Sequence, residues 1–188
     1  MFAHGSGSSR LSPRNRYVAQ VLNEGRLATL LFDLLTLDEE AVDTRTAHLR
    51  FDIAFLAGRV ADATRWVHTH SETRQLRIGY FGASTGAAAA LVAAAELPDI
   101  VQAVASRGGR PDLAIPAIPD VKAPTLLIVG GADRTVLEMN RKALDHFRVE
   151  ATLEVVPGAS HLFEEPGTLE IVARLARDWF QRWLGPTA

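Results

Sequence analysis

The amino-acid sequence predicts an α/β fold, with a mostly parallel central sheet and helices on both of its faces. Apolar runs of strand length alternate with longer segments whose apolar residues recur at helical spacing, which is typical of parallel strands joined by crossover helices. A glycine-rich turn, Gly82-Ala83-Ser84-Thr85-Gly86, joins one predicted strand to an alanine-rich helix. We expect residues 1–188 to form a single domain, because the chain has the length of one domain and shows no internal repeat.

The composition narrows the possible function classes. Of the 188 residues 47% are hydrophobic and 22% charged, as in ordinary globular proteins, and the net charge of −2 does not favour a nucleic-acid partner. The chain has no cysteine, which excludes disulfides, thiolate catalysis and cysteine metal sites. No apolar run approaches the ~18 residues of a membrane span, and the first residues do not resemble a signal peptide. We therefore expect a cytoplasmic protein without membrane contact.

The first third of the chain is interpreted from caps and apolar spacing. Ser12 and Pro13 suit the N-cap and first position of a helix that ends at Gly25. The continuous apolar run 27–35 predicts a strand buried on both faces, followed by a polar loop over about 36–50. The next helix is expected to bury residues at helical spacing, namely Phe51, Phe55, Leu56, Val60, Ala63 and Val67.

The remaining elements alternate regularly. A last amphipathic helix is expected to be capped by Thr168 and to stop at Gly185-Pro186. Another helix precedes the last strand and has Val136, Leu137 and Leu144 on one side. The predicted strands of this part are 76–81, 100–106, 125–129 and 152–156.

The turn at 82–86 has the pattern G-x-S-x-G in the strand-to-helix context where this pattern presents a nucleophilic serine. Gly82 and Gly86 would let strand and helix approach closely, and Ser84 would take a strained backbone conformation. The alternative is a tight turn in which the serine is incidental. Other residues must therefore support a catalytic interpretation.

Two further residues follow predicted strands: Asp133 comes after 125–129, and His161 after 152–156. Because the carboxyl ends of parallel strands share one edge, Ser84, Asp133 and His161 are expected to lie together. A serine needs a base to remove its proton, and an imidazole base needs a carboxylate to orient it. Asp133 alone could be a helix cap and His161 an ordinary loop histidine. The three together, in the order Ser, Asp, His, favour a catalytic triad.

Other loops could complete such a site. The loop His4-Gly5-Ser6 could be a flexible linker, but as part of a site it offers the backbone amide of Ser6, with that of Thr85, as an oxyanion hole. Arg107 and Arg110 are candidates for binding a substrate carboxylate or phosphate. Arginines on a solvated rim are at least as good an explanation for those two. The proposed chemistry needs no metal and no cofactor.

At these residues the chain resembles the dienelactone hydrolase branch of the α/β-hydrolase superfamily. The resemblance covers nearly the whole chain, and it implies an α/β-hydrolase fold and a serine hydrolase that cleaves a small carboxylic ester or lactone through an acyl-enzyme. Some relatives of this kind are encoded with, or fused to, phosphoribosyltransferase domains, which implies a possible partner. The segments that carry the resemblance are HGSGSS at 4–9, LFDLLT at 31–36, GYFGASTG at 79–86, SRGGRPDL at 106–113, APTLLIVGGAD at 123–133 and VVPGASHLFEEPG at 155–167.

Two features depart from that family. Well-known dienelactone hydrolases have a cysteine nucleophile where Ser84 stands, and this chain begins where the family's third strand should already be ending. The fold is therefore expected to lack the usual first strands, and we expect the chain to be a shortened form of a longer protein, or to have the gap filled by another chain or by solvent. Low stability and homo-oligomerisation would follow from the open strand edges.

Other functions remain open at this point. The fold could be a non-catalytic module retained for protein contacts, with a phosphoribosyltransferase as one possible partner. Within the enzyme class, thioester hydrolysis and acyl transfer use the same residues, and the sequence does not separate them from ester hydrolysis.

Overall fold

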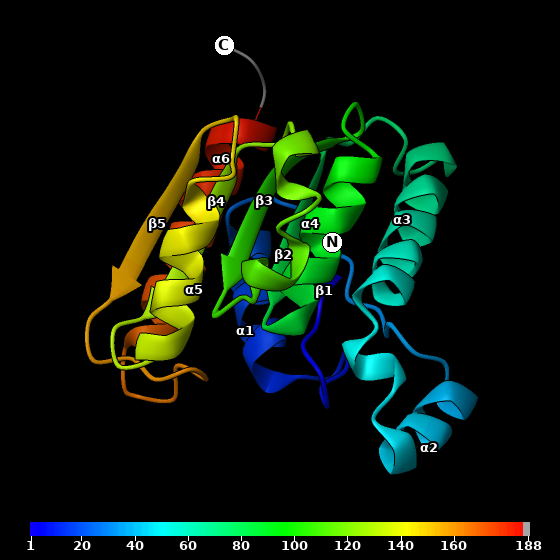
Figure 1. Cartoon of the computed structure of the whole chain (residues 1–188). Helices are drawn as coiled ribbons and strands as arrows, with labels where there is room; N and C mark the ends of the chain where they lie inside the picture. Colours follow the sequence, from blue (N-terminus) through cyan, green and yellow to red (C-terminus); the bar gives the residue numbers. More distant parts are fainter. Residues whose placement is uncertain (186–188) are drawn as a thin grey trace.

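Five parallel strands form the central sheet of the computed structural model, which describes residues 1–185 (Figure 1). Each strand pairs with its neighbour in parallel, so that the carboxyl ends share one edge, toward which the strand arrows point in Figure 1. The parallel α/β architecture expected from the sequence is confirmed. In sheet order, which is also sequence order, the strands are β1 Phe2–Ala3, β2 Ile78–Ala83, β3 Val101–Arg107, β4 Thr125–Gly130 and β5 Ala151–Val156.

Helices cover both faces of this sheet (Figure 1). On one face α1 and α6 pack against each other and bury Phe81 and Ala105 of the strands. On the other face α3, α4 and α5 cover Tyr80 and Val104. None of the helices in residues 1–185 is both long and apolar enough to cross a membrane. The helices are α1 Pro13–Glu24, α2 Leu37–Thr46, α3 Ile53–Thr69, α4 Thr85–Glu96, α5 Arg134–Leu144 and α6 Thr168–Leu184.

The predicted helix cap is confirmed near the start of the chain and wrong near its end. Ser12 accepts a hydrogen bond from the Asn15 amide at 3.3 Å and caps α1, as predicted. The prediction that Thr168 caps α6 is wrong. Gly167, with a φ of 81°, is the N-cap, while the Thr168 hydroxyl donates to the Glu165 carbonyl at 2.7 Å. Pro186, part of the predicted helix stop, lies outside the described residues.

The predicted strand at 27–35 is not a strand. The segment forms one isolated bridge, between Leu31 and Phe2, and the Phe2 amide donates to the Leu30 carbonyl at 2.9 Å. Its neighbour β1 has two residues, so the ladder cannot continue along the segment. Leu34 alone is buried in this run, whereas a strand covered on both faces would bury most of its side chains.

The predicted polar loop at 36–50 contains the helix α2 instead. The Thr36 hydroxyl accepts from the Glu39 amide, and the Glu39 carboxylate accepts from the Thr36 amide at 2.7 Å, which forms a capping box. The acidic first turn also favours a helix start. A helix that is polar on most sides gives no apolar periodicity, and this explains the wrong prediction. Phe51 was expected on the buried face of the next helix but lies before α3 and is 58% exposed.

Candidate active site

Ser84 stands between β2 and α4 in a backbone conformation that non-glycine residues rarely adopt, with φ 50° and ψ −123°. A Cβ atom at Gly82 would lie 2.4 Å from the Ala87 Cα, and one at Gly86 would lie 2.2 Å from the Ala3 carbonyl oxygen. Any side chain at either position would collide with backbone. The two glycines thus do what the sequence pattern predicted: they let α4 start directly above the strand end.

The loop after β3 holds Ser84 and His161 at the same part of the sheet edge. The Ser84 amide donates to the Arg107 carbonyl at 3.2 Å, and the Ser84 carbonyl accepts from the Arg110 amide at 3.1 Å. Gly108, with a φ of 51°, lies against His161: a Cβ there would be 3.5 Å from the ring atoms Nδ1 and Cε1. Ser84 and His161 therefore contact two neighbouring residues of one short loop.

His161 and Asp133 are joined directly. The His161 Nδ1 lies 2.6 Å from the Asp133 Oδ2, with the aspartate side chain 14% exposed and the histidine side chain 39% exposed. Nε2 of His161 is the ring nitrogen that this contact does not use. Among residues 1–185 Ser84 makes no side-chain hydrogen bond to His161. The structure thus pairs two of the three predicted residues, and the backbone of the third is bonded to the segment 107–110, whose Gly108 lies against His161.

The histidine loop is fixed by contacts that the sequence did not indicate. The Ala132 amide beside Asp133 donates to the Ala159 carbonyl at 3.0 Å, which ties the loop of the acid to that of the base. The Ser160 amide donates to the Glu165 carboxylate at 3.0 Å, and this bond lowers the pKa of Glu165. Sequence analysis missed Glu165, because an acidic residue in a loop is too common to be a signal.

The His4–Ser6 loop lies against the serine turn, as predicted. A Cβ at Gly5 would be 3.1 Å from the Ser84 Cβ, and the buried His4 accepts from the Leu34 amide at 3.0 Å through Nε2. The Ser6 amide, however, donates to the Thr85 hydroxyl at 3.0 Å. The two predicted oxyanion residues therefore contact each other, and the amide of Ser6 is occupied in this structure. Thr85 is the first residue of α4, so the Thr85 amide has no acceptor within the helix.

The two candidate binding arginines differ in their surroundings. Arg110 forms a two-pronged ion pair with Asp112, both distances 2.8 Å, and this pair raises the pKa of Arg110. Arg107 is buried, with 8% of the residue exposed, and no described residue accepts a hydrogen bond from its side chain. Burial, with a smaller contribution from the charge of Arg14, lowers the pKa of Arg107 to about 10. Arg107 is thus not on a solvated rim.

Comparison with known structures supports the same fold. The chain is 63% identical to a dienelactone hydrolase from Anabaena variabilis, whose crystal structure superposes with a TM-score of 0.96 over 97% of this chain and 85% of that one. It also superposes on Est1E from Butyrivibrio proteoclasticus with a TM-score of 0.79, over 96% of this chain and 86% of that one. The sequence identity to Est1E is 15%, so that this second likeness shows the fold alone.

Curated relatives and a family comparison complete the assignment. Proteins from two strains of Mycobacterium tuberculosis are 61% identical over 180 residues and carry the provisional name phosphoribosyl transferase. The match covers 96% of this chain and 40% of theirs, so the chain spans about two fifths of the length of these relatives. Residues 22–184 match the family model of the dienelactone hydrolases. The chain has the α/β-hydrolase fold and belongs to the dienelactone hydrolase family.

Proposed function

We propose that this member of a hydrolase family is a serine hydrolase that cleaves a small carboxylic ester or lactone. The observation that carries the proposal is the 2.6 Å contact of His161 with Asp133 at the sheet edge where Ser84 occupies its strained turn. The name of the Anabaena relative, a dienelactone hydrolase, supports a lactone among the substrates. A serine in place of a cysteine nucleophile favours ordinary ester chemistry.

The contact with Asp133 assigns the two ring nitrogens different roles. Because the carboxylate accepts from Nδ1–H, Nε2 of His161 is free to take the proton of the Ser84 hydroxyl as Oγ attacks the substrate carbonyl carbon. The tetrahedral intermediate then expels the alcohol, which receives that proton from Nε2. Water attacks the acyl-enzyme, gives a proton to Nε2, and the acid leaves as the proton returns to Oγ. In a lactone the released alcohol remains part of the acyl chain, so the second step frees a single hydroxy acid.

The negative charge on the carbonyl oxygen needs donors that are already in place. We assign this role to the amide of Thr85 at the start of α4 and to that of Ser6. The Ser6 amide donates to the Thr85 hydroxyl in this structure. It can donate to the substrate oxyanion only if this hydroxyl turns away. The Thr85 hydroxyl would hold the His4–Ser6 loop near the serine before the substrate binds, and the Thr85 amide would donate to the oxyanion afterwards.

The burial of Arg107 is the reason for proposing that the substrate carries an anionic group. A guanidinium that is largely buried without an acceptor is costly, and a bound carboxylate or phosphate would supply the missing acceptor. Arg14, whose Nη1 lies 3.3 Å from the Glu164 carboxylate, adds a positive charge that contributes to the lowered pKa of Arg107. Arg110, whose charge is already paired with Asp112, is left out of this role.

A matched pair of esters tests the role of Arg107. We expect 4-nitrophenyl hemisuccinate to be cleaved with a kcat/KM about 10- to 100-fold above that of 4-nitrophenyl butyrate, the range that one charge-assisted hydrogen bond supports. Arg107→Met should remove the preference and Arg110→Met should keep it. Equal rates for the two esters, or a preference that survives Arg107→Met, would exclude the assignment.

A second candidate function is a binding module without catalysis. It is favoured by the name phosphoribosyl transferase that the Mycobacterium tuberculosis relatives carry, since most of their length lies outside the match. Labelling with a fluorophosphonate probe separates the two candidates, because the probe reacts with an activated serine whatever the natural substrate is. We expect labelling of the wild type and none of Ser84→Ala. An unlabelled wild type would favour the binding module. It would also count against thioester hydrolysis and acyl transfer, because both need the same activated serine.

A further inference from the structure

Asn140 is a fully buried polar residue in α5, the helix that begins directly after Asp133. Its side-chain Nδ2 donates to the Val136 carbonyl of the same helix at 2.8 Å and to the Gly109 carbonyl at 3.0 Å. No backbone amide within residues 1–185 donates to that Gly109 carbonyl. Asn140 therefore connects the helix of the candidate acid to the segment 107–110 at the end of β3.

The two neighbours of Gly109 contact the candidate triad. The Arg110 amide donates to the Ser84 carbonyl at 3.1 Å, and Gly108 lies against the ring of His161. Because Gly109 stands between these neighbours and peptide units are rigid, a shift of its carbonyl would move both contacts. The helix that begins at the acid thus also holds the backbone that contacts the nucleophile and the base.

The consecutive glycines 108 and 109 make this segment dependent on such hydrogen bonds. Glycine has wide backbone freedom, so the sequence of the segment does not by itself fix its position. The Gly108 amide donates to the Ile128 carbonyl of β4 at 2.8 Å. Asn140 supplies the corresponding bond to the Gly109 carbonyl.

Stability alone does not account for an asparagine at position 140. The Oδ1 atom of Asn140 is buried and has no hydrogen-bond partner in the part of the chain that the structure describes. A buried amide oxygen without a donor is costly. The other buried residues of α5 include Val136, Leu137 and Ala143, so that a leucine would suit these surroundings. The feature that only a polar side chain provides here is the donation to Gly109.

We propose that Asn140 is a positioning residue of the candidate active site, an inference that rests on the proposed hydrolase function. By holding the Gly109 carbonyl, Asn140 keeps the segment 107–110 in place against Ser84 and His161. It touches no reacting atom, and its effect on the reaction passes through the backbone of that segment. A misplacement of about 1 Å in a catalytic group can lower a rate about 100-fold.

Asn140→Leu tests this role, because it removes the donor together with the unpartnered oxygen. We expect kcat for 4-nitrophenyl acetate to fall about 10- to 100-fold with KM within about threefold, and fluorophosphonate labelling of Ser84 to slow by a similar factor. The melting temperature should change by less than about 4 °C, since the lost hydrogen bond and the lost unpaired oxygen offset each other. Hydrogen exchange of the Arg110 amide should become at least about tenfold faster.

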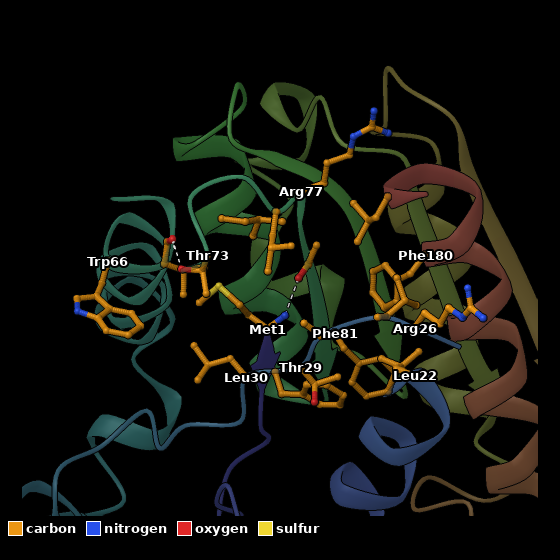
Figure 2. Close-up of a pocket in the computed structure, with 18 residues that line it drawn as sticks. Met1, Leu22, Arg26, Thr29, Leu30, Trp66, Thr73, Arg77, Phe81 and Phe180 are labelled. Atoms are coloured by element: carbon orange, nitrogen blue, oxygen red, sulfur yellow. Dashed lines mark hydrogen bonds between the residues drawn. The ribbon is translucent and has the colours of Figure 1, made fainter. Parts of the chain in front are cut away.

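Thr73→Val is the matched control. Thr73 borders the pocket shown in Figure 2, and its hydroxyl donates to the Val67 carbonyl at 2.6 Å. Like Asn140, Thr73 ties a loop to a helix, but it precedes β2, whereas Ser84 follows that strand. We expect this substitution to lower the melting temperature by about 2–4 °C and to leave kcat and the labelling rate within about twofold of the wild type.

Three results would overturn the role of Asn140. The first is a kcat of Asn140→Leu within about threefold of the wild type, or an unchanged exchange rate of the Arg110 amide. The second is a melting temperature lowered by more than about 4 °C, which would make Asn140 a residue of stability. The third is an equal loss of kcat in Thr73→Val, which would show that any lost hydrogen bond has this effect.

Asn140→Ser makes the same comparison if the leucine variant does not fold. A serine hydroxyl on a helix donates to the carbonyl one turn earlier and is too short to reach Gly109, so the loss of kcat should recur. A serine variant with the wild-type kcat would exclude the role. A wild type that the fluorophosphonate does not label would remove the proposed hydrolase function and this inference with it. Equal labelling rates of the wild type and Asn140→Leu would remove the inference alone.

Discussion

Asp133→Asn keeps the size of the side chain and removes its charge, so it isolates what the carboxylate does for His161. The wild-type carboxylate lies 2.6 Å from Nδ1 and can only accept, which places the proton on Nδ1 and leaves Nε2 unprotonated. An asparagine amide can instead donate to Nδ1. The proton then sits on Nε2, and His161 can no longer take the proton of Ser84.

The expected loss follows from the geometry of the pair. In Ser-His-Asp triads this substitution lowers kcat about 10⁴-fold, which corresponds to ~5 kcal/mol of transition-state stabilisation. The Asp133 side chain is 14% exposed, so its interaction is little screened, whereas the His161 side chain is 39% exposed and partly hydrated. We therefore expect a loss of about 10³- to 10⁴-fold in kcat/KM, with a residual rate from the oxyanion donors.

The assay is the hydrolysis of 4-nitrophenyl acetate, with circular dichroism to confirm that the variant is folded. Asp112→Asn is the matched control, because Asp112 pairs with Arg110 beside the site and has no role in the triad. We expect its rate to stay within about threefold of the wild type, the scale of a lost partly exposed ion pair. If Asp133→Asn kept more than a tenth of the wild-type rate, His161 would not depend on Asp133 and the triad would have to be abandoned.

Two further predictions use the same edge of the sheet. Ser84→Ala and His161→Ala should each lower kcat/KM nearly as much as the double variant, because the residues act as one unit; additive losses in steady-state kinetics would contradict a shared mechanism. Gly86→Ala should destabilise the fold by about 2–3 kcal/mol through overpacking, since its Cβ would lie 2.2 Å from the Ala3 carbonyl oxygen. Gly58→Ala in α3, where the new Cβ would have no described atom within 4 Å apart from its chain neighbours and the backbone of its own helix, should instead stabilise by about 0.5–1 kcal/mol. Urea unfolding of both variants measures the difference, and an equal effect of the two substitutions would show that the serine turn is not close-packed.

The sequence by itself determined the parts that depend on local chemistry and on the direction of parallel strands. Four of the predicted strands correspond to β2, β3, β4 and β5, since their apolar runs lie between clear turn signals. Gly82 and Gly86 were identified because a serine turn of this kind leaves no room for side chains there. Asp133 and His161 could be expected to meet, because residues that follow parallel strands arrive at one edge of the sheet.

Tertiary structure decided the features that depend on contacts between residues distant in the sequence. The apolar run 27–35 failed as a strand because a strand needs a partner along its length, and β1 offers two residues. The burial of Arg107 and the pairing of Arg110 with Asp112 depend on which neighbours the fold brings close, although the two arginines are only three positions apart, at and just after the end of β3. The same holds for the Ser6 amide, which the approach of α4 pairs with the Thr85 hydroxyl. Hydrogen bonding and desolvation act between groups that are distant in the chain, and their outcome is set by packing and not by the residues on either side.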